Sequence, residues 1–83
     1  MLLVPYDGSR LARAAIERAR EVAELRDESV LALTVLPDDA AFARERGWIG
    51  EDEAYDQDAV AARFEREVAE RAPDATFRVE QPD

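Results

Sequence analysis

The chain begins with the stretch MLLVPYDGS, residues 1–9, and this stretch decides the fold. Met1 to Val4 form a wholly apolar run, which predicts a short strand buried on both faces, as in a parallel sheet. Pro5 is expected to end the hydrogen-bonded ladder on its side, because proline has no N–H group. Ser9 is a favourable N-cap for a helix that starts at the next residue. A carboxylate, Asp7, therefore stands between the end of the strand and the start of the helix.

The rest of the chain alternates between helical and extended patterns. Residues 10–26 and 58–72 carry apolar side chains at the spacing of amphipathic helices. Residues 29–36 form a second apolar run typical of an interior strand, and residues 75–80 alternate like a strand with one solvated face. The order strand, helix, strand, helix, strand predicts an α/β fold with a three-layer arrangement of a parallel sheet and its helices. We expect one domain over residues 1–83.

The segment between residues 40 and 57 is irregular, with a helical turn expected over residues 41–46. Two interpretations of its large side chains stay open. They form a binding patch for a partner, or they fold back and cover a face of the sheet, which is the interpretation that we favour. The residues concerned are Phe42, Trp48, Ile49 and Tyr55. The acidic run that follows lacks the spacing of a calcium loop, so it predicts solvated surface and no metal site.

Composition excludes several classes of function. The 83 residues include no histidine and no cysteine, which excludes imidazole catalysis, disulfides and thiolate metal sites. Twenty acidic residues against eleven basic ones give a net charge of −9, which disfavours nucleic acids and anionic lipid as partners. No apolar run approaches the roughly 20 residues of a membrane span, and no signal-peptide pattern opens the chain. We therefore expect a soluble, cytoplasmic protein.

Asp7 allows two interpretations. In the first, Asp7 and Ser9 only satisfy the turn and the helix start, while Gly8 supplies an unusual backbone angle. In the second, Asp7 accepts a hydrogen bond from a ligand, because ligands of parallel α/β sheets bind beyond the carboxyl ends of the strands. Spacing alone leaves both open.

The stretch VPYDGS, residues 4–9, resembles the start of proteins of the universal stress protein family. The following helix carries the family's pattern of small and aliphatic residues, here AIERAREVA at residues 15–23. Residues 31–37, LALTVLP, are similar to the family's second strand. The resemblance covers the whole chain, but it is specific only in the first nine residues and the first helix.

This resemblance implies a fold with five parallel strands in which many members bind ATP. It implies that Pro5, Tyr6 and Asp7 line the adenosine side of a pocket, that Val35 packs near the base, and that amides around Gly8 and Ser9 face the phosphates. ATP-binding members carry a later glycine motif that holds the phosphates and the ribose, and this chain lacks it. The chain stops where the next helix would start, so the resemblance implies a shortened or truncated member without the last strand–helix–strand part.

The expected function is that of a stress-response or nucleotide-sensing module that is not an enzyme. It would hold at most a partial ATP or adenosine site, with weak affinity and no metal. The alternative is a non-nucleotide interaction or oligomerisation domain. A homodimer or larger oligomer is expected in either case, because three parallel strands with two helices leave an open edge and an uncovered face of the sheet.

All eleven basic residues are arginine, and this absence of lysine in an acidic chain suggests a halophilic protein adapted to high salt. At about 1 M salt the Debye length is only about 3 Å, so the self-repulsion of a strongly negative surface is screened. We therefore expect a higher melting temperature in molar potassium chloride than in dilute buffer. Equal melting temperatures under the two conditions would remove the halophilic interpretation.

Overall fold

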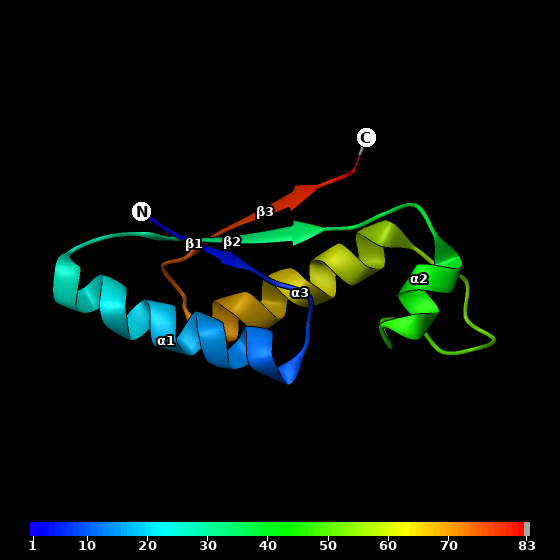
Figure 1. Cartoon of the computed structure of the whole chain (residues 1–83), viewed down its shortest axis with the longest axis horizontal. Helices are drawn as coiled ribbons and strands as arrows, with labels where there is room; N and C mark the ends of the chain where they lie inside the picture. The colour runs from blue at the N-terminus through cyan, green and yellow to red at the C-terminus, as the bar shows by residue number, and fades with distance from the viewer. Residues whose placement is uncertain (83) are drawn as a thin grey trace.

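Three strands and three helices make up the protein in a computed structural model, which describes residues 1–82 (Figure 1). The strands are β1 (Leu2–Pro5), β2 (Val30–Val35) and β3 (Thr76–Glu80). The helices are α1 (Arg10–Arg26), α2 (Ala40–Glu45) and α3 (Gln57–Arg71). The predicted order of strands and helices is confirmed, and the expected helical turn after the second strand is the short helix α2.

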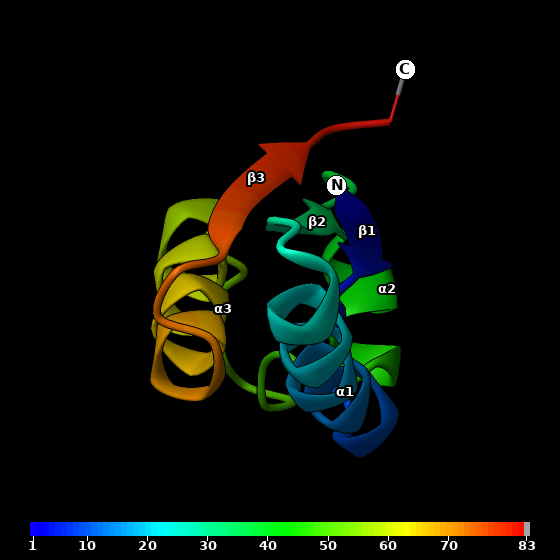
Figure 2. The same cartoon turned by 90° about the vertical axis from the view of Figure 1, so that its left-hand side faces the viewer.

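The strands form one parallel sheet in the order β1-β2-β3. Since each crossover moves one strand further in the same direction, two right-handed crossovers place α1 and α3 on the same face of the sheet. Figures 1 and 2 show both long helices beneath the sheet, side by side. The α/β class with a parallel sheet is thus as expected. Within residues 1–82 it comprises two layers, and the third layer of the expected arrangement is not among them.

The expectation that Pro5 ends the ladder is wrong. Pro5 pairs in register with Leu33, and the next residue, Tyr6, still donates its backbone N–H to the carbonyl oxygen of Leu33 at 2.7 Å. The backbone N–H of Leu2 likewise donates to the carbonyl oxygen of Ser29, at 2.8 Å. The backbone N–H groups of even-numbered residues therefore point toward β2, and those of odd-numbered residues point away from it. Pro5 therefore turns its missing N–H toward the free edge of the sheet, where it breaks no bond.

Side-chain caps define where the helices begin. The Ser9 hydroxyl accepts from the amide of Ala12 at the start of α1, as the sequence predicts. Asp39 and Asp56 cap α2 and α3 in the same way, each accepting from two amides of the first turn. At the other end of α1, Asp27 adopts a left-handed conformation (φ +54°), which ends the helix before β2.

The core lies between the sheet and the two long helices. The strands contribute alternate residues, among them Val4, Ala32 and Thr34, and the helices contribute the fully buried Ile16 and Phe64. Thr34 is the polar member of this layer, and its hydroxyl donates to the carbonyl oxygen of Tyr6 at 2.9 Å. The buried hydroxyl thus costs no unpaired hydrogen bond and links β2 to the end of β1.

The opposite face of the sheet is open in the described residues, so the expectation of strands buried on both faces is not met there. Leu3 is 59% exposed and Val35 is 48% exposed, although both lie within strands. Leu3 pairs with Leu31 and Pro5 pairs with Leu33, so these side chains form one continuous apolar surface on β1 and β2. We call this surface, made of Leu3, Pro5, Leu31, Leu33 and Val35, the open sheet face.

None of the helices in residues 1–82 has the length and the apolar character needed to span a membrane.

Gly8 gives a test of the packing at the end of β1. Its φ is +80°, and an added Cβ would lie 2.6 Å from Cε1 of the fully buried Phe64 ring. We expect Gly8→Ala to lower the free energy of unfolding by about 2–4 kcal/mol, from backbone strain and steric overlap together. Urea unfolding measures this loss.

Gly47→Ala is the matched control, because Gly47 also has a positive φ (+75°) but nothing within 4 Å of an added Cβ. It should cost only the strain of about 1–2 kcal/mol. Equal losses in the two variants would show that the contact with Phe64 adds nothing.

Candidate functional site

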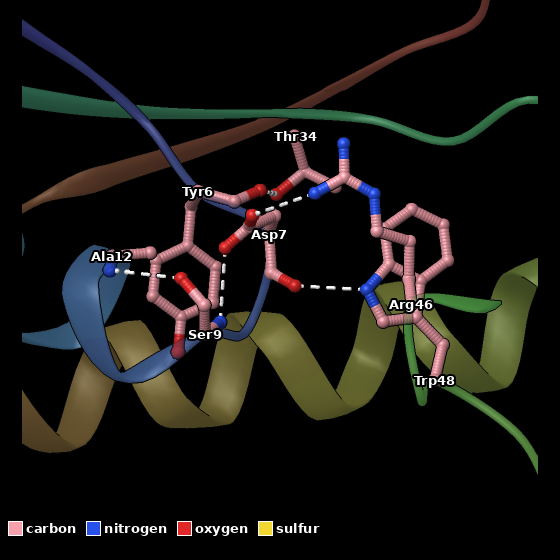
Figure 3. A network of polar contacts seen from close by, with 7 residues as sticks. All are labelled: Tyr6, Asp7, Ser9, Ala12, Thr34, Arg46 and Trp48. Carbon is pink, nitrogen blue, oxygen red and sulfur yellow. Dashed lines mark hydrogen bonds and ion pairs between the residues drawn. The ribbon is translucent and has the colours of Figure 1, made fainter.

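The turn between β1 and α1 holds Asp7 in a defined position (Figure 3). One carboxylate oxygen, Oδ1, accepts from the backbone N–H of Ser9 at 2.9 Å. The other, Oδ2, lies 3.4 Å from Nη1 of Arg46, which comes from the end of α2. The left-handed backbone at Gly8 lets the chain turn back, so that the N–H of Ser9 can reach the side chain of Asp7. The Asp7 side chain is nevertheless 40% exposed, so solvent or a ligand can still reach it.

The hydrogen bonds that Ser9 donates, together with the positive charge of Arg46, hold the pKa of Asp7 below its ordinary value. Partial burial acts in the opposite direction but does not prevail. The carboxylate is therefore ionised at neutral pH and serves only as an acceptor. Because its pKa is lowered by folding, Asp7 stabilises the native state above the ordinary carboxyl pKa, and this contribution is lost as the pH falls through the lowered value.

Trp48 fastens the segment after α2 to this turn. Its indole N–H donates to the carbonyl oxygen of Asp7 at 2.8 Å, and its ring packs edge-on against Phe64 of α3, with centroids 5.6 Å apart. Trp48 and Ile49 are 5% and 7% exposed, so these two side chains fold back as expected, but Trp48 packs on α3 and on the turn and does not cover a face of the sheet. Phe42 and Tyr55 are only partly buried. Since Arg46 lies two residues before Trp48, the same contacts bring its guanidinium beside the carboxylate of Asp7.

A groove of about 530 Å³ opens beside this cluster, along the free edge of β1 and the carboxyl ends of β1 and β2. This volume is within the usual range of small-molecule sites, about 300–1,000 Å³. Its walls come from the β1–α1 turn, from the first turns of α1, from the end of β2 and from the segment that includes α2. The lining residues include Pro5, Asp7, Ser9, Leu11, Val35, Pro37, Phe42, Arg46 and Trp48.

Five of the six residues predicted for a nucleotide site line this groove, namely Pro5, Tyr6, Asp7, Ser9 and Val35. Gly8 is not among the lining residues and packs instead against Phe64.

The side chain of Tyr6 packs in the core. Its ring meets Phe64 edge-on, with centroids 5.5 Å apart, and its hydroxyl donates to Oε1 of Glu67 at 2.5 Å. Burial first, and then the bond to Glu67, raise the pKa of the Tyr6 hydroxyl. The polar end of Tyr6 is therefore committed to α3, and the residue is only 2% exposed.

Among the lining residues that sequence reasoning did not assign to the site, Arg46 and Trp48 are the two whose side chains bond to Asp7. Trp48 carries a signal, because a tryptophan between two glycines in an irregular segment is expected to pack somewhere. Arg46 carries no such signal, since it is one of the eleven arginines of the chain and lies in a segment expected to be an exposed helical turn. Its place beside Asp7 follows only from how the segment after α2 folds back.

Among the hollows described in residues 1–82, the groove is the one that we prefer as a small-molecule site. These residues contain no group of three or more acidic side chains placed to hold a metal ion. A second hollow of about 400 Å³ lies at the other end of the sheet, near the start of β2, and is lined by Arg20, Glu24, Asp27, Glu28 and Asp74 among others. The groove is preferred because ligands of parallel α/β sheets bind at the carboxyl ends of the strands.

Comparison with known proteins agrees with the fold. A search of curated proteins finds no significant match. The model of the universal stress protein family matches residues 1–83. That match spans the β1–α1 turn, the parallel sheet and both long helices. The chain therefore belongs to the universal stress protein family.

Proposed function

We propose that this universal stress protein senses adenine nucleotides by binding their adenosine part in the groove, and that it acts as a regulatory module and not as an enzyme. The observation that carries the proposal is the ionised, partly exposed carboxylate of Asp7 at the edge of a groove with mostly apolar walls. A carboxylate in this position accepts a hydrogen bond from an adenine amine or a ribose hydroxyl.

The walls of the groove supply the apolar contact that a base needs. Val35 is 48% exposed at the end of β2, and Pro5 and Pro37 present rigid apolar rings at the ends of both strands. Asp7 has about four acceptor positions on its two oxygens, of which Ser9 and Arg46 use two. Acceptor capacity for a ligand therefore remains. Affinity of residues 1–83 should be weak and magnesium should help little, because the glycine motif of ATP-binding members is not among these residues.

Removing the carboxylate tests this proposal. A hydrogen bond to a charged group contributes roughly 1.5–3 kcal/mol, so Asp7→Ala should weaken adenosine binding by about 10- to 100-fold. Asp7→Asn keeps an oxygen that can accept from Ser9 and should lose most of the same affinity while retaining the turn. Calorimetric titration with adenosine and ATP measures the change. The fluorescence of Trp48, the one tryptophan of the chain, reports binding at this groove.

Glu21→Ala is a matched control, since it removes one negative charge from an exposed position of α1 that does not line the groove. It should leave the affinity unchanged within about twofold. If the wild-type protein gives no heat at millimolar adenosine or ATP, the nucleotide proposal fails and Asp7 is a residue of the turn alone.

A second candidate function is an interaction domain that assembles through the open sheet face. Exposed Leu3 and Val35, with their neighbours Leu31 and Leu33, support it, because a continuous apolar surface on a soluble protein is normally covered. The occupant we propose is a second copy of the chain, packed face to face as a homodimer. The row of β3 on the same face carries Arg78 and Glu80, which gives a two-fold partner complementary charges.

Sedimentation tests the dimer. At tens of micromolar the wild-type protein should be dimeric, and Leu3→Gln should raise the dissociation constant by about tenfold or more, since Leu3 is lost from both copies. Leu25→Gln is the control, because Leu25 is 88% exposed on α1, away from the open sheet face. A folded wild-type monomer at this concentration would contradict the dimer without touching the nucleotide proposal.

A further inference from the structure

The guanidinium of Arg46 stands beside Asp7 at the rim of the groove. We infer that Arg46 exchanges between Asp7 and the phosphate of a bound nucleotide, so that the groove prefers phosphorylated adenine nucleotides over adenosine. The inference rests on the proposed function, and it adds to it the residue that selects a phosphorylated ligand.

The pair between Arg46 and Asp7 is weak enough to be exchanged. Its single contact, Nη1 to Oδ2, is 3.4 Å long, and the two side chains are 51% and 40% exposed. Ion pairs with this exposure contribute little to stability, because water solvates both partners after separation. A phosphate group offers the guanidinium a stronger partner, since its oxygens match the planar fork with two parallel hydrogen bonds.

Arg46 is also held in place for this exchange. It is the C-cap residue of α2, and its guanidinium lies over the ring of Phe42, with Cζ 5.1 Å from the centroid. The ring supports the cation from one side and leaves its edges free to bind. Among the residues that line the groove, Arg46 is the single basic one. In a chain with a net charge of −9, this local cation decides whether an anion can enter.

The turn offers a phosphate fewer free backbone N–H groups than the sequence predicts. The Ser9 amide, expected to face the phosphates, already donates to Oδ1 of Asp7. The amide of Ala12 donates to the Ser9 hydroxyl, and that of Arg13 donates to the Ser9 carbonyl. These donors serve the turn and the first turn of α1. Arg46 can bind a phosphate without breaking any of these hydrogen bonds.

The exchange predicts opposite effects of one substitution on two ligands. Adenosine has no phosphate, so Arg46 only competes with it for Asp7. Arg46→Ala should free Asp7 and tighten adenosine binding by about two- to fivefold. AMP loses its phosphate contact in the same variant and should bind about tenfold more weakly. The wild-type protein should prefer AMP over adenosine by about tenfold, and Arg46→Ala should abolish or reverse this preference.

Titration calorimetry with adenosine and AMP, on wild type, Arg46→Ala, Arg46→Lys and Arg44→Ala, tests the inference. Arg44→Ala removes the same charge from an exposed position of α2 that does not line the groove, and it should keep the wild-type preference. Arg46→Lys keeps the charge without the fork and should retain part of it. The ratio of the two affinities within one variant cancels any loss of folded protein.

The outcomes separate the two proposals. Binding of adenosine by the wild type with no preference for AMP overturns the role of Arg46 and leaves the proposed function intact. Equal weakening of both ligands by Arg46→Ala overturns it as well, because Arg46 would then only support the fold of the site. A wild-type protein that binds neither ligand overturns the proposed function, and the inference fails with it.

Discussion

The close approach of Gly8 to Phe64 is the constraint on which the rest of the structure depends. The Phe64 ring is fully buried on α3 and sits where a side chain at Gly8 would otherwise lie, with its Cε1 only 2.6 Å from the position of a Cβ. The turn after β1 can therefore descend onto α3. Tyr6 and Trp48 each meet the same ring edge-on, at 5.5 and 5.6 Å. One aromatic side chain thus joins the sheet, the turn and the segment that follows α2.

The candidate site follows from this packing. Trp48 is fixed by Phe64 and by its bond to the Asp7 carbonyl, and Arg46, two residues earlier, is thereby brought next to the Asp7 carboxylate. The carboxylate and the guanidinium come from residues 39 positions apart, yet they meet at the rim of the groove. The core layer is thereby responsible for the charge pattern at the surface. A groove with one acid and one base side by side suits a ligand that is both a hydrogen-bond donor and an anion.

The sheet of residues 1–82 has two different faces, because both long helices lie on one of them. The helix-side residues of β2, such as Ala32 and Thr34, are completely buried, whereas Val35 on the other face is 48% exposed. The groove and the open sheet face share Pro5, Leu33 and Val35. Covering that face by a second copy would therefore also narrow the entrance to the groove.

The sequence by itself determined the elements and the turn at the centre of the candidate site. Periodicity predicted α1 from Arg10 to Arg26, and it placed α3 and β3 to within one residue at either end. The stretch from Pro5 to Ser9 indicated both the turn and the carboxylate at its centre. These features are local, because a helical stripe, a cap and an apolar run each depend on residues a few positions apart. They can therefore be recognised in the sequence alone.

Only the tertiary structure decided which side chains meet. Pro5 extends the ladder because its lack of an N–H falls on the free edge, and this depends on the parity of pairing with β2. Tyr6 points into the core and Gly8 packs on Phe64, although both lie in the predicted site. Arg46 reaches Asp7 because distant aromatic rings pack together. Such contacts are selected by the fit of the whole core, which no local pattern of the sequence expresses.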